Sequence, residues 1–400
     1  MRSIVYTPLD TRQHGDPNLL CAPPTWMDYL IFFGANYLAH AVTLIGRPGA
    51  TTLETFVDTA NALFIPGSGA LRAVNLLVHC VSICHQSSLD SAAKAGALCM
   101  VVKEKHLPRL FVGFSGEQIS ETGRDWFSSA FRISGMPHRI PLSRAIFGTI
   151  HLPEGKGYTL IEVPPQVLLR VGGSHTSTNR RHRSRSENQE RSSTQDFRVP
   201  ATRDIPRILA SILQILWGIV TLYKTGGNQI QLYGYGAFGL TVAPYAIMSF
   251  LNLATHLMHP NYSTMYLVHT QDMEAAHHAE NVRGHFAGWV AHANLNDHPM
   301  PTRTFLVIHG LGYLAIVVTP IIIVGALTGF ESGTNVIIRR SWILGWLIVG
   351  SASSPWVSIF NAANPIIRLL VCFPLWIPAI GGMVVVGQML NDFGICKRLD

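Results

Sequence analysis

The sequence has little charge. Asp, Glu, Lys and Arg make up 13% of its 400 residues, whereas a soluble globular protein carries roughly 25%. Residues 86–204 hold 17 of the 30 basic and 11 of the 23 acidic residues, so the other 281 residues share only 25 charges. Long tracts with almost no charge exclude an ordinary cytosolic enzyme. They predict an all-α polytopic membrane protein.

Several recognisable signals are also missing. Residues 1–24 contain no apolar core of a cleaved signal peptide, so we expect the first apolar span to act as an uncleaved anchor. The six Cys are scattered without a CxxC pair, so the sequence predicts no disulfide framework and leaves the redox compartment open. No Walker A loop, GxGxxG, GxSxG or HExxH motif is present. We therefore expect no cofactor, and the absence of enzymatic activity is favoured.

The apolar segments predict six or seven transmembrane helices, because a helix needs about 20 apolar residues to cross a bilayer. A doubtful seventh segment, Leu71–Cys84, is apolar for 14 residues only, which is typical of an interfacial or protein-buried helix. The six longer segments are Trp26–Ile45, Ile205–Tyr223, Leu232–Met258, Thr304–Leu327, Trp342–Phe360 and Ile366–Met389.

Orientation follows the distribution of Lys and Arg beside the spans. The basic residues around the insert place residues 86–204 in the cytosol, and the loop 259–303 on the same side. Arg339 and Arg340 then fall on the outer side and oppose this assignment. The sequon at Asn261 opposes it too, because a glycosylated loop is luminal or extracellular.

The cytosolic insert has three expected parts. Residues 86–104 predict an amphipathic helix, and the runs 146–152 and 158–163 predict a small β-hairpin. Residues 172–204 are Ser- and Arg-rich, which predicts a disordered linker. Its arginine run, 180–185, would suit anionic lipid headgroups or RNA; a solvated tail that reinforces orientation is favoured, and nucleic acid is not expected as a partner.

These features divide the chain into segments with different expected roles. They are an N-terminal tail with one span and the doubtful second (1–85), the cytosolic insert (86–171), the disordered linker (172–204), a helix pair (205–258), a His-rich loop (259–303), three spans (304–389) and a C-terminal tail (390–400).

Histidine is unusually frequent, with 18 in the chain, and it gives the one candidate metal site. His256 and His259, three residues apart, could share an ion, as could Glu274 with His277 or His278 on a helix. A di-iron carboxylate centre would need two Glu-x-x-His motifs and two further glutamates, and only one such motif is present. A polar, partly exposed loop helix is therefore the favoured alternative.

Transport is a second possibility. Ser353-Ser354-Pro355 and the prolines of 374–378 could break helices near the midplane, as transporters do. However, no Asp, Glu or Lys lies inside the last five spans. Asp28 and His40 in the first span are the intramembrane ionisable residues that an ion-coupled carrier would need.

Several stretches resemble known sequences. The most specific are YGYGAFGLTVAPYAIMSFLNL (233–253) and PNYSTMYLV (260–268), with 23–49, 92–103 and 152–165 beside them. On these stretches the chain resembles uncharacterised polytopic integral membrane proteins of filamentous ascomycete fungi. The resemblance implies a multi-pass membrane location and no catalytic residue.

Together these observations favour a non-enzymatic membrane scaffold or sensor. Its expected partners are the lipid bilayer and cytosolic proteins that bind the insert. A small-solute transporter or channel is the first alternative, and a metal-dependent membrane enzyme is the second.

Overall fold

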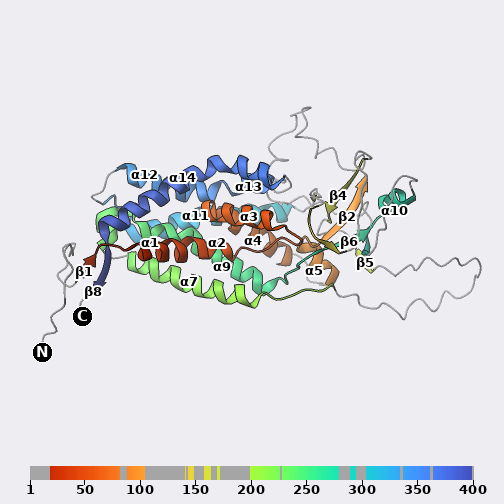
Figure 1. Ribbon diagram of the computed structural model, residues 1–400, viewed down its shortest axis with the longest axis horizontal. Helices are drawn as coiled ribbons and strands as arrows, with labels where there is room; N and C mark the ends of the chain where they lie inside the picture. Colours follow the sequence, from red (N-terminus) through yellow and green to blue (C-terminus); the bar gives the residue numbers. More distant parts are fainter. Residues whose placement is uncertain are drawn as a thin grey trace, which may run out of the picture.

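The computed structural model is an elongated helical bundle with a β-sheet at one end and the two ends of the described chain at the other (Figure 1). It describes residues 19–81, 88–103, 140, 143–147, 157–163, 169–171, 199–225, 228–278, 289–293, 303–333, 337–360 and 364–398.

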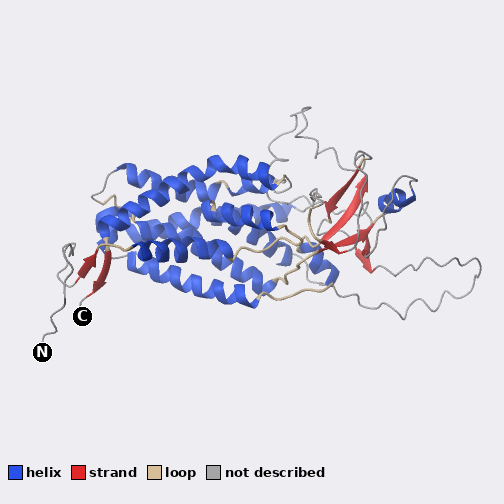
Figure 2. Cartoon of the chain, in the orientation of Figure 1, coloured by secondary structure: helices blue, strands red, loops and turns tan. Residues whose placement is uncertain are grey.

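The bundle contains helices from both halves of the chain (Figure 1), and Figure 2 shows that the strands lie at the two ends of this helical part. The short helices α8 (Asn228–Tyr233), η4 (Gly234–Gly236) and η5 (Phe238–Val242) connect α7 to α9. The other elements of the bundle are α1 (Trp26–Phe33), the π-helical η1 (Gly34–Leu38), α2 (Ala39–Val42), α3 (Thr52–Phe64), α4 (Pro66–Val81), α7 (Ile205–Thr225), α9 (Ala243–Met258), α11 (Arg303–Thr328), α12 (Ile337–Ala352), α13 (Ser354–Ile359) and α14 (Pro365–Phe393).

Four helices are long and apolar enough to cross a membrane, and a fifth span results if the bent pair α3–α4 counts as one. The four are Ile205–Thr225, Phe238–Met258, Val307–Thr328 and Pro365–Phe393. Large apolar side chains cover their outer faces; Leu213 is 67% exposed and Leu370 is 66% exposed. A face of this kind requires an apolar surrounding, so the chain is a membrane protein.

The doubtful segment Leu71–Cys84 overlaps α4, a helix buried in the protein. Its Leu71 and Val74 belong to the main core, and α3 and α4 are bent by 112° at the break between them. Gly67 at the start of α4 lies against the backbone of Gly350 and Ser351, where a Cβ atom would meet the Ser351 carbonyl oxygen at 2.5 Å. This close approach fixes the bend inside the bundle.

Two predicted spans are irregular in the structure. The segment Trp342–Phe360 is divided into α12 and α13, and Pro355 occupies the first turn of α13, where a missing N–H costs no helical hydrogen bond. The first span contains the π-helical turn η1. There the Asn36 Nδ2 donates to the Phe32 carbonyl at 2.9 Å. Turns of this type are frequent at functional sites.

The sheet combines strands from two chain segments that α7 and α9 separate. The strand order is β4-β2-β6-β7-β5, with β3 also paired to β6. β2 pairs antiparallel with β4 but parallel with β6, and β6 pairs parallel with β7. The strands are β2 (Leu98–Lys103), β3 (Ile146–Phe147), β4 (Tyr158–Glu162), β5 (Leu169–Val171), β6 (Met265–His269) and β7 (Trp289–Ala293), with helices α5 (Ser88–Lys94) and α10 (Gln271–His278).

Two predictions for the insert were wrong. The helix expected over 86–104 ends at Lys94, and residues 98–103 form strand β2, because its apolar residues are buried on both faces, as in a central strand. The runs expected to form a hairpin become β3 and β4, which pair with β6 and β2 and not with each other in the described part of the chain. The insert also shares its sheet with strands from residues 259–303.

The predicted linker is only partly described. Residues 172–198, with the arginine run 180–185, lie outside the described residues. Residues 199–204 are ordered, contrary to the prediction: the Val199 N–H donates to the Ser88 Oγ at 2.9 Å, and Thr202 forms a β-bridge with Asn261. These hydrogen bonds join the end of the predicted linker to helix α5, through Ser88, and to the loop after α9, through Asn261.

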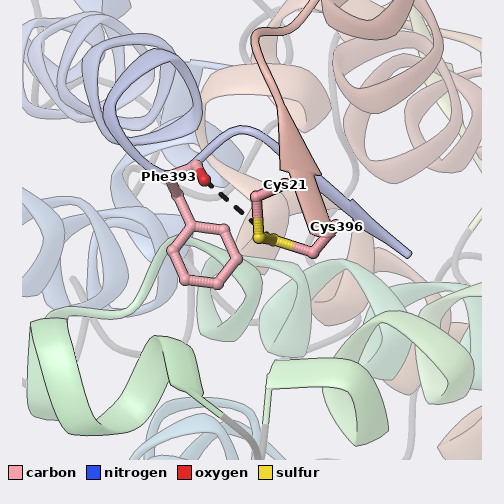
Figure 3. The surroundings of a disulfide bond; sticks show 3 residues. All are labelled: Cys21, Phe393 and Cys396. Carbon is pink, nitrogen blue, oxygen red and sulfur yellow. Dashed lines mark hydrogen bonds between the residues drawn. A yellow bond between two sulfur atoms is a disulfide. The ribbon is translucent and has the colours of Figure 1, made fainter. Parts of the chain in front are cut away.

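A disulfide joins the two ends of the described chain, contrary to the expectation from cysteine spacing. Strands β1 (Leu19–Ala22) and β8 (Ile395–Arg398) pair antiparallel, with Cys21 directly opposite Cys396, and the two are bonded (Figure 3). A separation of 375 residues carries no local pattern, so only the fold brings the two thiols together. Among the described cysteines, Cys99 and Cys372 are free and buried.

Removing this disulfide should destabilise the protein. We expect Cys21→Ser to lower the free energy of unfolding by about 3–5 kcal/mol, because the bond closes a long loop in the unfolded chain. Thermal unfolding in detergent, with and without reductant, measures the effect. Reductant should lower the unfolding temperature of the wild type to that of the variant and leave the variant unchanged. An equal unfolding temperature in both proteins without reductant would contradict the prediction.

Candidate functional site: a polar seam inside the bundle

Helix α7 has its polar residues on the inside and its apolar residues on the outside. Its buried positions are Ser211, Gln214, Gly218 and Thr225, which follow one another at intervals of three, four and seven residues and so share one helix face. Leu213, by contrast, is 67% exposed. This arrangement is the reverse of that in a soluble protein, and it directs a polar face toward the neighbouring helices.

Helix α9 and the first span complete this polar region. On α9, Ser249, Asn252 and His256 are buried and share one face, and the first span adds Asn36 and His40. We name the whole set the polar seam; it consists of Asn36, His40, Thr43, Ser211, Gln214, Thr221, Ser249, Asn252 and His256. From Ser211 to Thr225 the helix rises about 21 Å, most of the roughly 30 Å hydrocarbon core.

Hydrogen bonds in the seam favour one neutral tautomer of His40. The Gln214 Nε2 donates to the Ala39 carbonyl at 2.6 Å, so the Gln214 Oε1 faces Ser249 and accepts its hydroxyl proton at 3.2 Å. With its single proton used there, the Ser249 Oγ can only accept from His40 Nδ1, at 2.7 Å. A neutral His40 therefore carries its proton on Nδ1 and presents an unprotonated Nε2.

Several polar atoms of the seam have no hydrogen-bond partner. They are the Nε2 of His40, the Oγ of Ser211, and both side-chain polar atoms of Asn252, all in residues that are 0% exposed. A buried polar atom left unpaired costs about 1–3 kcal/mol. Native proteins retain few such atoms, and those they keep often serve a ligand, an ion or water. The seam is therefore equipped to contact a small polar species.

The seam opens toward the sheet at a small cavity. The cavity has a volume of about 20 Å³ and is lined in part by Gly46, Thr255, His256 and His259, which leaves room for about one water. Burial, together with the nearby Lys94 cation, lowers the pKa of His259, which lies in the loop after α9. At the other end of the seam, the Thr221 Oγ1 donates to the Asn36 Oδ1 at 2.9 Å.

The predicted metal ligands are only partly brought together. His256 and His259 each direct one ring nitrogen at a backbone carbonyl, of Thr43 at 3.2 Å and of Pro260 at 2.9 Å. Glu274 pairs with His269 at 3.3 Å. Within the described residues, no three His, Cys, Asp or Glu side chains are placed to hold a metal ion.

His277 and His278 end helix α10, and their side chains lie outside the described residues. Metal binding by Glu274 with either histidine therefore stays a prediction.

Sequence reasoning singled out His40 and His256 of the seam but missed the polar face of α7. Ser211 and Gln214 are two polar residues in an otherwise apolar run, whose mean hydropathy remains that of a membrane span. Their spacing of three, continued by Gly218, was the signal that could have revealed a polar helix face.

No protein-family model matches the chain, and no similarity to a curated protein or a solved structure was found. The resemblance to fungal membrane proteins stays a prediction, and the function must be argued from the geometry.

Proposed function

We propose that the chain is a six-span membrane protein that transfers protons or a small polar solute along the polar seam. His40 carries the proposal: it is an ionisable side chain that is 0% exposed, and it lies among polar groups from three helices. Ionisable residues inside a membrane are costly and usually mark a transport pathway or proton relay. The cavity at the sheet-side end of the polar seam has room for about one water. Because this is too small for a continuous pathway, the structure corresponds to a closed state.

Pairing of the terminal strands supports six spans. Because β1 and β8 lie side by side, the chain between them crosses the membrane an even number of times. Six crossings are supplied by α1–α2, α7, α9, α11, α12–α13 and α14, while the bent pair α3–α4 enters and leaves from the sheet side (Figure 1). A seventh crossing would place the two cysteines of the disulfide on opposite sides.

The disulfide also supports an orientation. Disulfides persist in oxidising compartments and are rare in the cytosol, so the end with Cys21 and Cys396 faces the lumen or the outside. The sheet, at the other end, then faces the cytosol, in agreement with the Lys and Arg distribution.

Asn261 should therefore carry no glycan. We expect full-length protein from a glycosylating host to keep its gel mobility after enzymatic deglycosylation, because Asn261 lies on the sheet side. The matched control is Val5→Asn, which creates Asn-Tyr-Thr in the segment before β1, on the opposite side, and should become glycosylated. A glycan on Asn261 in the wild type would reverse the proposed orientation.

Flux measurements test the function itself. Purified protein is reconstituted into vesicles that contain a pH-sensitive dye, and proton entry is followed after a pH step; entry of urea and glycerol is followed in parallel by light scattering. We expect at least one flux to exceed that of protein-free vesicles about tenfold or more. If proton, urea and glycerol entry all remain at the rates of protein-free vesicles, the proposed transport function is wrong.

A scaffold or sensor is the second candidate, and one contact favours it. The Arg144 Nε pairs with the Glu54 Oε1 at 3.3 Å, and both side chains are buried. This pair couples the segment leading into β3 to helix α3 of the bundle, so a partner bound at the sheet would act on the membrane helices. Co-purification of a protein that binds the sheet domain, without any flux, would favour this candidate.

A further inference from the structure

The cavity at the sheet-side end of the polar seam, which we name the mouth cavity, is enclosed by several chain segments. Its lining includes Leu76 of α4, Ala95 just after α5, Thr255 and His256 of α9, and His259 in the loop that follows α9. Its volume of about 20 Å³ leaves room for about one water. Because His256 belongs to both the cavity and the seam, a molecule bound here lies at the end of the row of buried polar groups.

Hydrogen bonds commit the ring protons of the two histidines to backbone carbonyls. The Nδ1 of His259 lies 2.9 Å from the Pro260 carbonyl oxygen, and the Nε2 of His256 lies 3.2 Å from that of Thr43. A carbonyl oxygen only accepts, so each of these nitrogens carries the proton of a neutral ring. The other two nitrogens, His259 Nε2 and His256 Nδ1, are then acceptors. The Nε2 of His259 is buried and has no hydrogen-bond partner among the described residues.

Thr255 provides a third acceptor. Its hydroxyl proton is directed at the carbonyls of Leu251, at 2.8 Å, and Ala73, at 3.4 Å, so its Oγ1 has only lone pairs to offer a molecule in the cavity. Asn261 and Tyr262 are the other polar side chains of the lining, and each can accept as well as donate. A molecule that satisfies this lining must therefore donate hydrogen bonds in two or three directions.

The charges around the cavity do not favour a cation. Burial and the nearby Lys94 cation lower the pKa of His259, which means that positive charge is disfavoured at this ring. Two charged groups near His256, Asp204 and Arg207, pair with each other at 3.2 Å. A neutral donor therefore suits the cavity better than a cation.

We propose that the mouth cavity binds a small neutral hydrogen-bond donor, water or ammonia, and selects this class of solute for the polar seam. Water donates two hydrogen bonds and ammonia three, and the two molecules are similar in size. Urea and glycerol are larger than the space for one water. This inference rests on the proposed function, since it names the solute that the seam transfers.

Flux into reconstituted vesicles tests the inference. Water flux is followed by light scattering after an osmotic step, and ammonia entry by the alkalinisation of an internal pH-sensitive dye after a pulse of ammonium chloride. We expect at least one of these fluxes to exceed that of protein-free vesicles. If both stay at the protein-free rate while protons, urea or glycerol enter faster, the solute class is wrong and the transport function stands. If every flux stays at that rate, both proposals are wrong.

Matched variants locate the site. Thr255→Val removes the Oγ1 acceptor with little change in side-chain size, so the water or ammonia flux should fall about threefold or more, a typical effect of losing one hydrogen bond. Thr59→Val is the control: the Thr59 hydroxyl also donates to the carbonyl one turn earlier, at 2.8 Å, but Thr59 does not line the cavity. It should keep the wild-type flux.

His259→Leu tests the buried acceptor nitrogen in the same assay. It removes the Nε2 of His259, so we expect a fall at least as large as in Thr255→Val. Each variant is compared at equal reconstituted protein with a monodisperse size-exclusion profile, and Thr255→Val, the more conservative change, serves if His259→Leu does not fold. An undiminished flux in either folded variant would overturn the proposal.

Discussion

Replacing Asp58 by Asn should lower the free energy of unfolding by about 3–5 kcal/mol, the usual effect of removing one partner from a buried ion pair. The loss is large because three arginines from three chain segments share this carboxylate. Without it Arg368, which is 1% exposed, loses the carboxylate at 2.8 Å from its guanidinium group. We expect a low yield of monodisperse protein in size-exclusion chromatography and a lower unfolding temperature.

Asp204→Asn is the matched control for Asp58→Asn. Asp204 pairs with Arg207 at 3.2 Å, but the two side chains are 22% and 34% exposed, so the stability should change by about 0.5 kcal/mol or less. Combining Asp58→Asn with Arg368→Gln removes the buried cation that loses its carboxylate and should recover part of the loss. If Asp58→Asn unfolds at the wild-type temperature, the carboxylate does not hold these segments together.

Two substitutions of His40 should separate proton transfer from solute transfer. His40→Leu removes both the titratable ring and the hydrogen bond to Ser249, so proton and solute flux should each fall about tenfold or more. His40→Gln keeps a polar side chain that cannot exchange a proton at neutral pH. It should therefore abolish proton flux and largely preserve the flux of a neutral solute.

The same vesicle measurements need a control for protein quality. Ser341→Ala removes a polar group from an exposed position of α12, away from the polar seam, and should retain wild-type flux. Each variant is compared at equal reconstituted protein, judged by size-exclusion profile. Wild-type proton flux in His40→Leu would exclude this histidine from the pathway.

Hydropathy located the regular spans well. The predicted segments 205–223 and 304–327 became α7 and α11, Ile205–Thr225 and Arg303–Thr328. The signal works because a bilayer requires a continuous apolar run, which is a local property. It left Leu71–Cys84 open between a span and a protein-buried helix, because a helix buried by protein and one buried by lipid have similar composition.

Long-range pairing could not be predicted. The six residues of β2 are a short apolar run, and periodicity alone cannot distinguish such a strand from a buried helix segment. Its parallel partner β6 lies beyond two membrane helices in the chain. The ion pair between Asp58 and Arg368 is similar, because the two residues are 310 positions apart and meet only when α3 packs on α14. Each case depends on contacts that leave no local trace.

The bond between Cys21 and Cys396 has a consequence for biogenesis. In the proposed orientation Cys21 is translocated at the beginning of synthesis, yet its partner emerges only after another 375 positions have been translated. During that interval the first thiol must remain reduced or be held in a temporary mixed disulfide. Oxidation of the pair is thus the last covalent step in maturation, and it occurs only in molecules whose final helix has been inserted with the correct polarity. A non-reducing gel would consequently report completed membrane insertion.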